Sequence, residues 1–166
     1  MSRYAAKTTV PVERSRAEIE ATLARYGAEQ FMYGWDAGGA LIAFVIQVAP
    51  EQKRQVRFQL PLPARGERRF THHTRGMRTP TEAERLWEQA CRQRWRALVL
   101  VVKAKLEAVE SGIATFEDEF LAYIMLPDGR TVGGWVGPQL EAAYDPDRGV
   151  MPASLPLLAL ESGESE

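Results

Sequence analysis

The residues with the clearest chemical potential are arginines gathered in the middle of the chain. Five lie within the short stretch 64–78, one lies on the expected strand before it, and four basic residues follow on the expected helix after it. Arginine contacts phosphate through paired hydrogen bonds and stacks on flat rings. We therefore expect these side chains to bind nucleic acid: Arg57, Arg65, Arg68, Arg69, Arg75, Arg78, Arg85, Arg92, Arg96 and Lys103.

The last four of these residues share one face of the expected helix. Arg85, Arg92, Arg96 and Lys103 follow one another at spacings of seven, four and seven residues, which return to the same side of an α-helix. A basic helix face can contact phosphates, or it can be solvated or neutralised by acidic neighbours. Both interpretations stay open at this point.

Aromatic side chains on a nearby strand add a second feature of nucleic-acid binding. Phe31, Tyr33 and Trp35 alternate along an expected edge strand and so share one of its faces. Aromatic rings beside basic groups form platforms on which unpaired bases stack. Tyr33 and Trp35 are the candidates for stacking, and packing of the rings against a helix is the alternative.

Metal and thiol chemistry have little support. His72 and His73 are adjacent, but the arginines around them oppose a bound cation. The single cysteine, Cys91, falls on an apolar helix stripe, where a thiolate is disfavoured. We therefore expect a protein that binds no metal or other cofactor.

A metal-dependent nuclease of the restriction type was the most specific enzymatic alternative. Its site would need Asp36 to converge with Glu51 and Lys53. These residues flank a central strand and therefore lie roughly 30 Å apart, at about 3.3 Å per residue. The sequence also has no phosphate-binding loop and no nucleophile elbow. We therefore expect a protein without catalytic activity.

The net charge hides a strong polarisation along the chain. The 166 residues hold 21 basic and 22 acidic side chains, for a formal net charge of −1. Residues 51–106 contain fourteen basic and five acidic groups, whereas residues 107–166 contain two basic and twelve acidic groups. Such asymmetry indicates an electrostatic partner or an acidic tail. The alternative is that the two segments face each other in the fold and cancel.

Composition places the chain among soluble globular proteins. Hydrophobic residues make up 45% and charged residues 26%, and a single cysteine excludes an intramolecular disulfide. No apolar run approaches the roughly 20 residues of a membrane span, and we expect no secretory leader. We expect a cytoplasmic protein of a bacterial host with no membrane partner. Homo-oligomerisation stays open.

The elements that position the basic and aromatic residues follow from periodicity and capping signals. A capping box at Ser15–Glu18 predicts a short helix over 16–26, after an extended arm over 1–14. Alternating and apolar segments then predict three strands that form an antiparallel meander: Gln30–Trp35, Ala40–Val48 and Gln55–Leu60. The arginine-rich stretch 64–78 is expected to be a loop.

A long helix over 80–111 is expected next. Thr79 is its N-cap, Pro80 occupies the first turn, and Gly112 follows its end. Apolar residues recur along it at intervals of three and four: Trp87, Cys91, Trp95, Leu98, Val102, Leu106 and Val109. A buried strand over 97–102 is the alternative for that part.

Shorter elements complete the expected fold. We predict helical turns over 116–122 and 139–144, a tight turn at 127–129, and an acidic Pro- and Gly-containing tail over 145–166. The elements predict a single α+β domain over 1–144, in α-β-β-β-α order, with the long helix covering the meander.

Three stretches resemble small uncharacterised proteins of phages and prophage-like elements: YAAKTTVPV at 4–12, YGA at 26–28 and LPDGRTV at 126–132. The resemblance covers most of the chain. It implies a role in DNA processing or against host systems, and it implies no catalytic residue. The α-β-β-β-α order is also similar to that of double-stranded-RNA-binding domains. The lysine signature of those domains is missing, because 79–84 holds two glutamates and no lysine.

The leading hypothesis is a non-catalytic nucleic-acid-binding accessory protein of a phage or mobile element. Its arginine-rich loop and helix face would contact phosphates, and the type of nucleic acid stays open. The alternative hypothesis is a protein-binding inhibitor or adaptor of the anti-host-defence type. That protein would engage a host or phage protein through its acidic C-terminal third.

Overall fold

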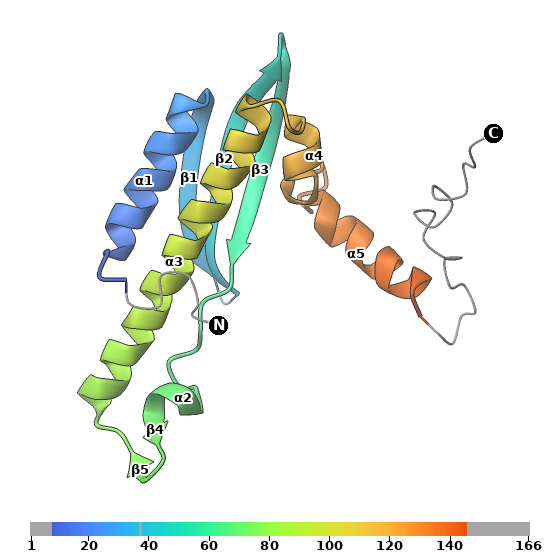
Figure 1. Cartoon of the computed structure of the whole chain (residues 1–166). Coiled ribbons are helices and arrows are strands. Elements are labelled where there is room, and N and C mark those ends of the chain that lie inside the picture. Colours follow the sequence, from blue (N-terminus) through green and yellow to red (C-terminus); the bar gives the residue numbers. More distant parts are fainter. Residues whose placement is uncertain (1–7, 37, 146–166) are drawn as a thin grey trace, which may run out of the picture.

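The computed structural model describes residues 8–36 and 38–145, so the first half of the predicted arm and the predicted tail beyond 145 lie outside the described residues. A helix, three strands and a long helix follow one another as the sequence predicts for this α+β domain (Figure 1). In chain order they are α1 (Val12–Arg25), β1 (Ala28–Asp36), β2 (Gly39–Ala49), β3 (Gln52–Leu60), α2 (Arg68–Thr71), β4 (His72–His73), β5 (Gly76–Met77), α3 (Pro80–Glu110), α4 (Phe116–Phe120), η1 (Leu121–Tyr123) and α5 (Val132–Ala143).

The three predicted strands form the predicted antiparallel meander. The sheet has the order β1-β2-β3, and its register places Tyr33 opposite Ile42 and Phe44 opposite Val56. Alternate residues of β3 are buried, as its sequence pattern predicts. The first hairpin turn is closed by the backbone N–H of Gly38, which donates to the Asp36 carboxylate at 2.7 Å.

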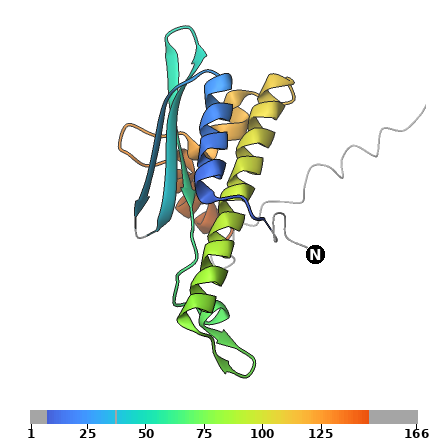
Figure 2. The ribbon, with the colours of Figure 1, turned by 90° about the vertical axis from the view of Figure 1, so that its left-hand side faces the viewer.

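Both α1 and α3 cover the same face of this sheet (Figure 2), and neither of them lies on the other face. The helices α1 and α3 run parallel to each other. Thr8, just before α1, contacts Gln89 of α3, and Tyr26, at the end of α1, contacts Glu107 further along α3. The core between helices and sheet is built from apolar side chains of α1, β2, β3 and α3, including Leu23, Phe44, Trp95 and Val102. Burial of this apolar surface is the main stabilising contribution.

The short helix α4 closes one end of the core with aromatic side chains. Its capping box is formed by Thr115 and Asp118, and it presents Phe116 and Phe120 to the sheet. The ring of Phe120 meets those of Phe44 and Phe58 edge-on, with 6.2 Å between centroids in both pairs. This geometry is the favoured one for aromatic pairs.

The long helix is confirmed over almost its whole predicted length. Thr79 accepts a hydrogen bond from the N–H of Glu82, Pro80 begins the helix, and Ser111 caps its end before Gly112 turns the chain at φ 73°. Residues 97–102 are helical, so the alternative of a strand there is wrong. The apolar stripe is buried at Cys91, Trp95, Leu98, Val102 and Leu106.

The first helix begins four residues earlier than predicted. Pro11 is its N-cap, and no side chain forms a capping hydrogen bond there, so the predicted capping box at Ser15–Glu18 is wrong. Residues 12–14 belong to the helix rather than to an extended arm. The Ser15 hydroxyl donates to the Pro11 carbonyl from inside the helix, at 3.4 Å, and its side chain is fully buried. Proline presets the backbone angle φ, which suits it to a helix start.

The stretch 64–78 is more ordered than the predicted loop. It contains α2 and a two-stranded hairpin of β4 and β5. Phe70 is buried and anchors it. The guanidinium of Arg78 closes it by donating to the backbone carbonyls of Arg69 and His72. Backbone carbonyls that accept hydrogen bonds in this way are typical of an ordered turn.

The last described helix is longer than predicted. The sequence indicated one turn over 139–144, but α5 spans Val132–Ala143 despite Pro138 in its interior. Thr131 accepts from the N–H of Gly134 and so starts the helix earlier. The turn predicted at 127–129 is confirmed, with Gly129 at φ 84°. None of the described helices is long and apolar enough to cross a bilayer.

Candidate nucleic-acid interface

A cleft of about 460 Å³ lies where α1 begins, between that helix, the end of β1 and the N-terminal half of α3. This volume is within the range of sites that bind small ligands. We call it the aromatic cleft, and it is lined by Pro11, Val12, Glu13, Arg16, Tyr33, Trp35, Ala40, Leu62, Trp87, Glu88, Cys91, Arg92 and Trp95.

The cleft exists because α3 extends further in one direction than the sheet and α1 do (Figure 1). Tyr33 and Trp35 project from β1 on the face that the helices cover, where Trp35 pairs across the sheet with Ala40. The methyl group of Ala40 fills little of the space below α3. Trp35, the last aromatic residue of β1, lines the cleft and stays 75% exposed.

The aromatic rings in the cleft form a continuous series from the core to solvent. Trp95 is 2% exposed, and its ring meets Tyr33 edge-on with 6.0 Å between centroids. The Tyr33 ring in turn lies 6.0 Å from that of Trp35 at an interplanar angle of 45°. The buried ring thus holds the exposed one in place. An exposed indole supported in this way is suited to stack on a flat ligand.

Two arginines bring positive charge to these rings. The guanidinium carbon of Arg16 lies 3.9 Å from the centroid of Tyr33, which is a close cation–π contact. No carboxylate of the described residues forms an ion pair with Arg16. Arg92 is held by the side-chain oxygen of Gln89 at 2.8 Å and lies 3.7 Å from Glu88.

The floor of the cleft contains the single cysteine. Cys91 is 6% exposed, and burial raises the pKa of its thiol to about 11. A thiol with this pKa is protonated near neutral pH and is a weak nucleophile. The interpretation of Cys91 as a packing residue therefore agrees with its surroundings.

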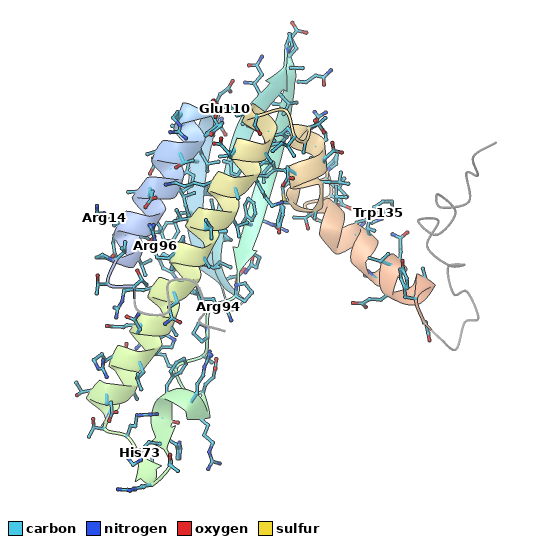
Figure 3. The ribbon with its side chains drawn as sticks, viewed as in Figure 1. Arg14, His73, Arg94, Arg96, Glu110 and Trp135 are labelled. Atoms are coloured by element: carbon cyan, nitrogen blue, oxygen red, sulfur yellow. The ribbon has the colours of Figure 1, made fainter. Side chains whose placement is uncertain are left out.

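Two residues of the predicted basic helix face have a different role. Arg96 and Lys103 both donate to the carboxylate of Glu18 on α1. These contacts lower the pKa of Glu18, with the hydrogen bond from Lys103 as the largest cause. Figure 3 shows Arg96 between the two helices, with Arg94 on the opposite side of α3. Arg96 and Lys103 thus join α1 to α3.

The arginines of 64–78 are divided between contacts within the protein and exposure to solvent. Arg65 pairs with Glu84 at 2.9 Å and covers the Trp87 ring at 4.0 Å. Arg69 pairs with Glu67 at 2.6 Å. Arg78 donates to the backbone carbonyls named above and pairs with Glu82. Within 8–36 and 38–145, the structure gives no ion pair to the remaining exposed arginines of the predicted set, Arg68, Arg75 and Arg85.

Arg57 is separated from the other predicted residues by the sheet. It pairs with Ala43 of β2 on the face that no helix covers, whereas Tyr33 and Trp35 lie on the covered face. The structure therefore brings Tyr33, Trp35 and Arg92 together. It places Arg68, Arg75 and Arg85 around the far end of α3 and leaves Arg57 apart.

The sequence pattern did not single out Trp87 and Arg16 as residues of the aromatic cleft. Trp87 belongs to the apolar stripe predicted for the helix, and Arg16 is not among the ten predicted basic residues. Trp95, of the same stripe, is core as the pattern predicts, and its ring also lines the cleft. A signal for Trp87 was its place as the first residue of the stripe, near the helix start, and its indole N–H donates to the Pro63 carbonyl at 2.8 Å.

The basic and acidic segments meet at ion pairs in the described part of the chain. Two ion pairs join them, Arg54 with Glu117 at 3.3 Å and Lys105 with Glu119 at 3.2 Å. Four others use carboxylates within the basic segment itself: Glu67, Glu82, Glu84 and Glu88. Much of the acidic charge is therefore used locally rather than to neutralise the exposed arginines.

The two histidines take part in local contacts of the hairpin. The His72 ring nitrogen lies 2.8 Å from the Thr71 hydroxyl, and the His73 ring accepts from the N–H of Arg75 at 3.0 Å. Among residues 8–36 and 38–145 there is no group of three or more histidine, cysteine or acidic side chains that could hold a metal ion.

Comparison of the chain with protein-family models, with curated proteins and with solved structures found no match in any of the three.

Proposed function

We propose that this protein is a non-catalytic accessory protein that binds single-stranded nucleic acid. The aromatic cleft would take an unpaired base, and the arginines along the N-terminal half of α3 and the neighbouring hairpin would contact phosphates. The phage or mobile-element origin in this proposal rests on the resemblance alone.

One observation carries the proposal: the 75% exposed indole of Trp35 lies in the same cleft as Arg16 and Arg92. Single-strand binding sites combine stacking rings with cationic groups that follow the phosphate backbone. Unpaired bases also stack on guanidinium planes. Arg68, Arg75 and Arg85 extend the positive surface away from the cleft because they form no ion pair with a described residue.

A protein-binding adaptor is the second candidate, and the exposed surface of α5 favours it. No residue of α5 is buried. Trp135 and Leu140 on this helix are 47% and 55% exposed, and Tyr144, which caps its end, is 61% exposed. Exposed apolar side chains close together on one element are typical of protein-binding surfaces. Two acidic residues of the C-terminal third, Glu117 and Glu119, are engaged within the fold because they form ion pairs.

A salt titration of the full chain with fluorescently labelled oligonucleotides separates the two candidates. For nucleic-acid binding we expect the logarithm of the association constant to fall linearly with the logarithm of salt concentration, because bound phosphates release counterions. We also expect single strands to bind more tightly than duplexes of the same length. No binding of any DNA or RNA at about 50 mM salt would overturn the proposal and favour the adaptor.

A further inference from the structure

We infer that the aromatic cleft selects an unpaired base that carries an exocyclic amino group, so that cytosine, adenine and guanine bind better than uracil or thymine. This inference rests on the proposed function, because it names the class of base that the same site takes.

The arrangement of rings leaves one stacking position for a base. Of the four aromatic residues, Trp95 is buried at 2% exposure. The Tyr33 ring is covered by Arg16 at 3.9 Å, and the Trp87 ring is covered by Arg65 at 4.0 Å. Trp35, at 75% exposure, is the ring with a free face, and the other rings form the walls beside it. The cleft therefore fits a single flat ring system.

The cleft also contains two carboxylates, and these determine what can lie beside the stacked base. Glu13 and Glu88 line it together with Arg16 and Arg92. A carboxylate only accepts hydrogen bonds and repels phosphate, so the phosphates are expected to stay outside, at the exposed arginines. An amino group of a base is the complementary donor, and acidic side chains are known to accept from the N4 amino group of cytosine.

The position of Glu88 is set by its neighbours on α3. The Arg92 guanidinium lies 3.7 Å from the Glu88 carboxylate and is itself held by Gln89. The Glu88 side chain stays 51% exposed, so it has room to accept from a ligand. In uracil and thymine a carbonyl oxygen replaces the amino group of cytosine, and this oxygen would be repelled by the carboxylate. The ring donor of these bases, N3–H, lies between two carbonyl oxygens, so a carboxylate that accepts from it also faces those oxygens.

The test compares single-stranded oligomers of deoxycytidine and deoxyuridine of equal length, at one salt concentration, by fluorescence anisotropy with the full chain. The two bases differ only at C4 and N3 of the ring, so stacking surface and phosphate charge are matched. We expect the deoxycytidine oligomer to bind about tenfold more tightly. Trp35→Ala should weaken binding of both oligomers by about tenfold, and the control Trp135→Ala, on α5 away from the cleft (Figure 3), should not.

The variant Glu13→Ala/Glu88→Ala then tests the carboxylates. We expect it to bind the two oligomers with similar affinity, because no acceptor for the amino group is left, while Glu141→Ala keeps the preference. If circular dichroism shows that the double variant does not fold, the single variant Glu88→Ala is tested in the same way instead. Equal binding of both oligomers by the unaltered protein, or a preference that survives in the double variant, overturns the inference but not the proposed function. Absence of binding to every oligonucleotide overturns the proposed function.

Discussion

At the scale of single residues, the hairpin that presents Trp35 depends on a glycine. Gly39 begins β2 with φ at 127°, a backbone conformation that other residues rarely adopt. A Cβ added there would lie 2.3 Å from the Leu60 carbonyl oxygen and 2.9 Å from the Leu62 nitrogen. Both atoms belong to the backbone and cannot rotate away. The sheet thus leaves no space for a side chain at this position.

We expect Gly39→Ala to lower the free energy of unfolding by about 3 kcal/mol, since backbone strain and a steric clash combine. Chemical denaturation followed by circular dichroism measures the change. The control is Gly27→Ala, where φ is 88° but no atom lies within 4 Å of the added Cβ. That variant should lose about 1 kcal/mol, because it has the backbone strain alone. Equal losses in the two variants would contradict the role of the clash.

At the scale of elements, the two helices above the sheet are joined by one acidic residue. Glu18 of α1 accepts from both Arg96 and Lys103 of α3. Its side chain is 30% exposed, so solvent screens these contacts in part. This bridge joins the middle of α1 to α3. Its contribution depends on the charge of Glu18.

We expect Glu18→Gln to destabilise the protein by about 1 kcal/mol near neutral pH. The contacts lower the pKa of Glu18 in the folded protein, so its contribution is present above the pKa of the unfolded chain. The contribution is lost as pH falls through the lowered pKa. Denaturation of both proteins at neutral and at acidic pH measures this, and the difference between them should shrink in acid. A difference that stays constant would contradict it.

At the scale of the whole molecule, the exposed arginines are distributed unevenly. Arg68, Arg75 and Arg85 lie around the end of α3 that extends beyond the sheet, whereas Arg96 and Lys103 are tied to Glu18. The surface available to phosphate is therefore smaller than that of the ten predicted residues. It lies around the N-terminal end of α3, and the following turns of that helix line the aromatic cleft with Trp87, Glu88 and Arg92. A strand with one base at Trp35 would have to run along α3 to bring its phosphates to these arginines.

We expect substitution of each free arginine by alanine, as in Arg68→Ala or Arg85→Ala, to reduce the slope of the log–log salt dependence for a single strand by about 0.7. Each lost phosphate contact releases one counterion fewer. Salt titration of oligonucleotide binding measures the slope. The matched control is Arg130→Ala, in the turn before α5, where Arg130 pairs with Asp128 at 2.7 Å. An unchanged slope in the Arg68 and Arg85 variants would place the phosphates elsewhere.

Much of this architecture was predictable because it depends on local signals. The alternation of Val56, Phe58 and Leu60 predicts one buried face of a strand, and Thr79 with Pro80 predicts the start of α3. Such patterns act over one or two turns of backbone and need no knowledge of the rest of the chain. The start of α1 was missed because Ser15 fits a capping signal equally well, and its burial inside the helix is a tertiary effect.

The sequence by itself determined the three strands and the long helix, their order, the antiparallel meander, and the excess of arginine in the middle of the chain. Only the tertiary structure decided which arginines are free, because Glu18 lies 78 residues from Arg96 and 85 residues from Lys103 in the sequence. It also decided that Trp35, Trp87 and Arg16 line one cleft. Contacts between distant segments follow from how helices pack on a sheet, and no local pattern in the chain records them.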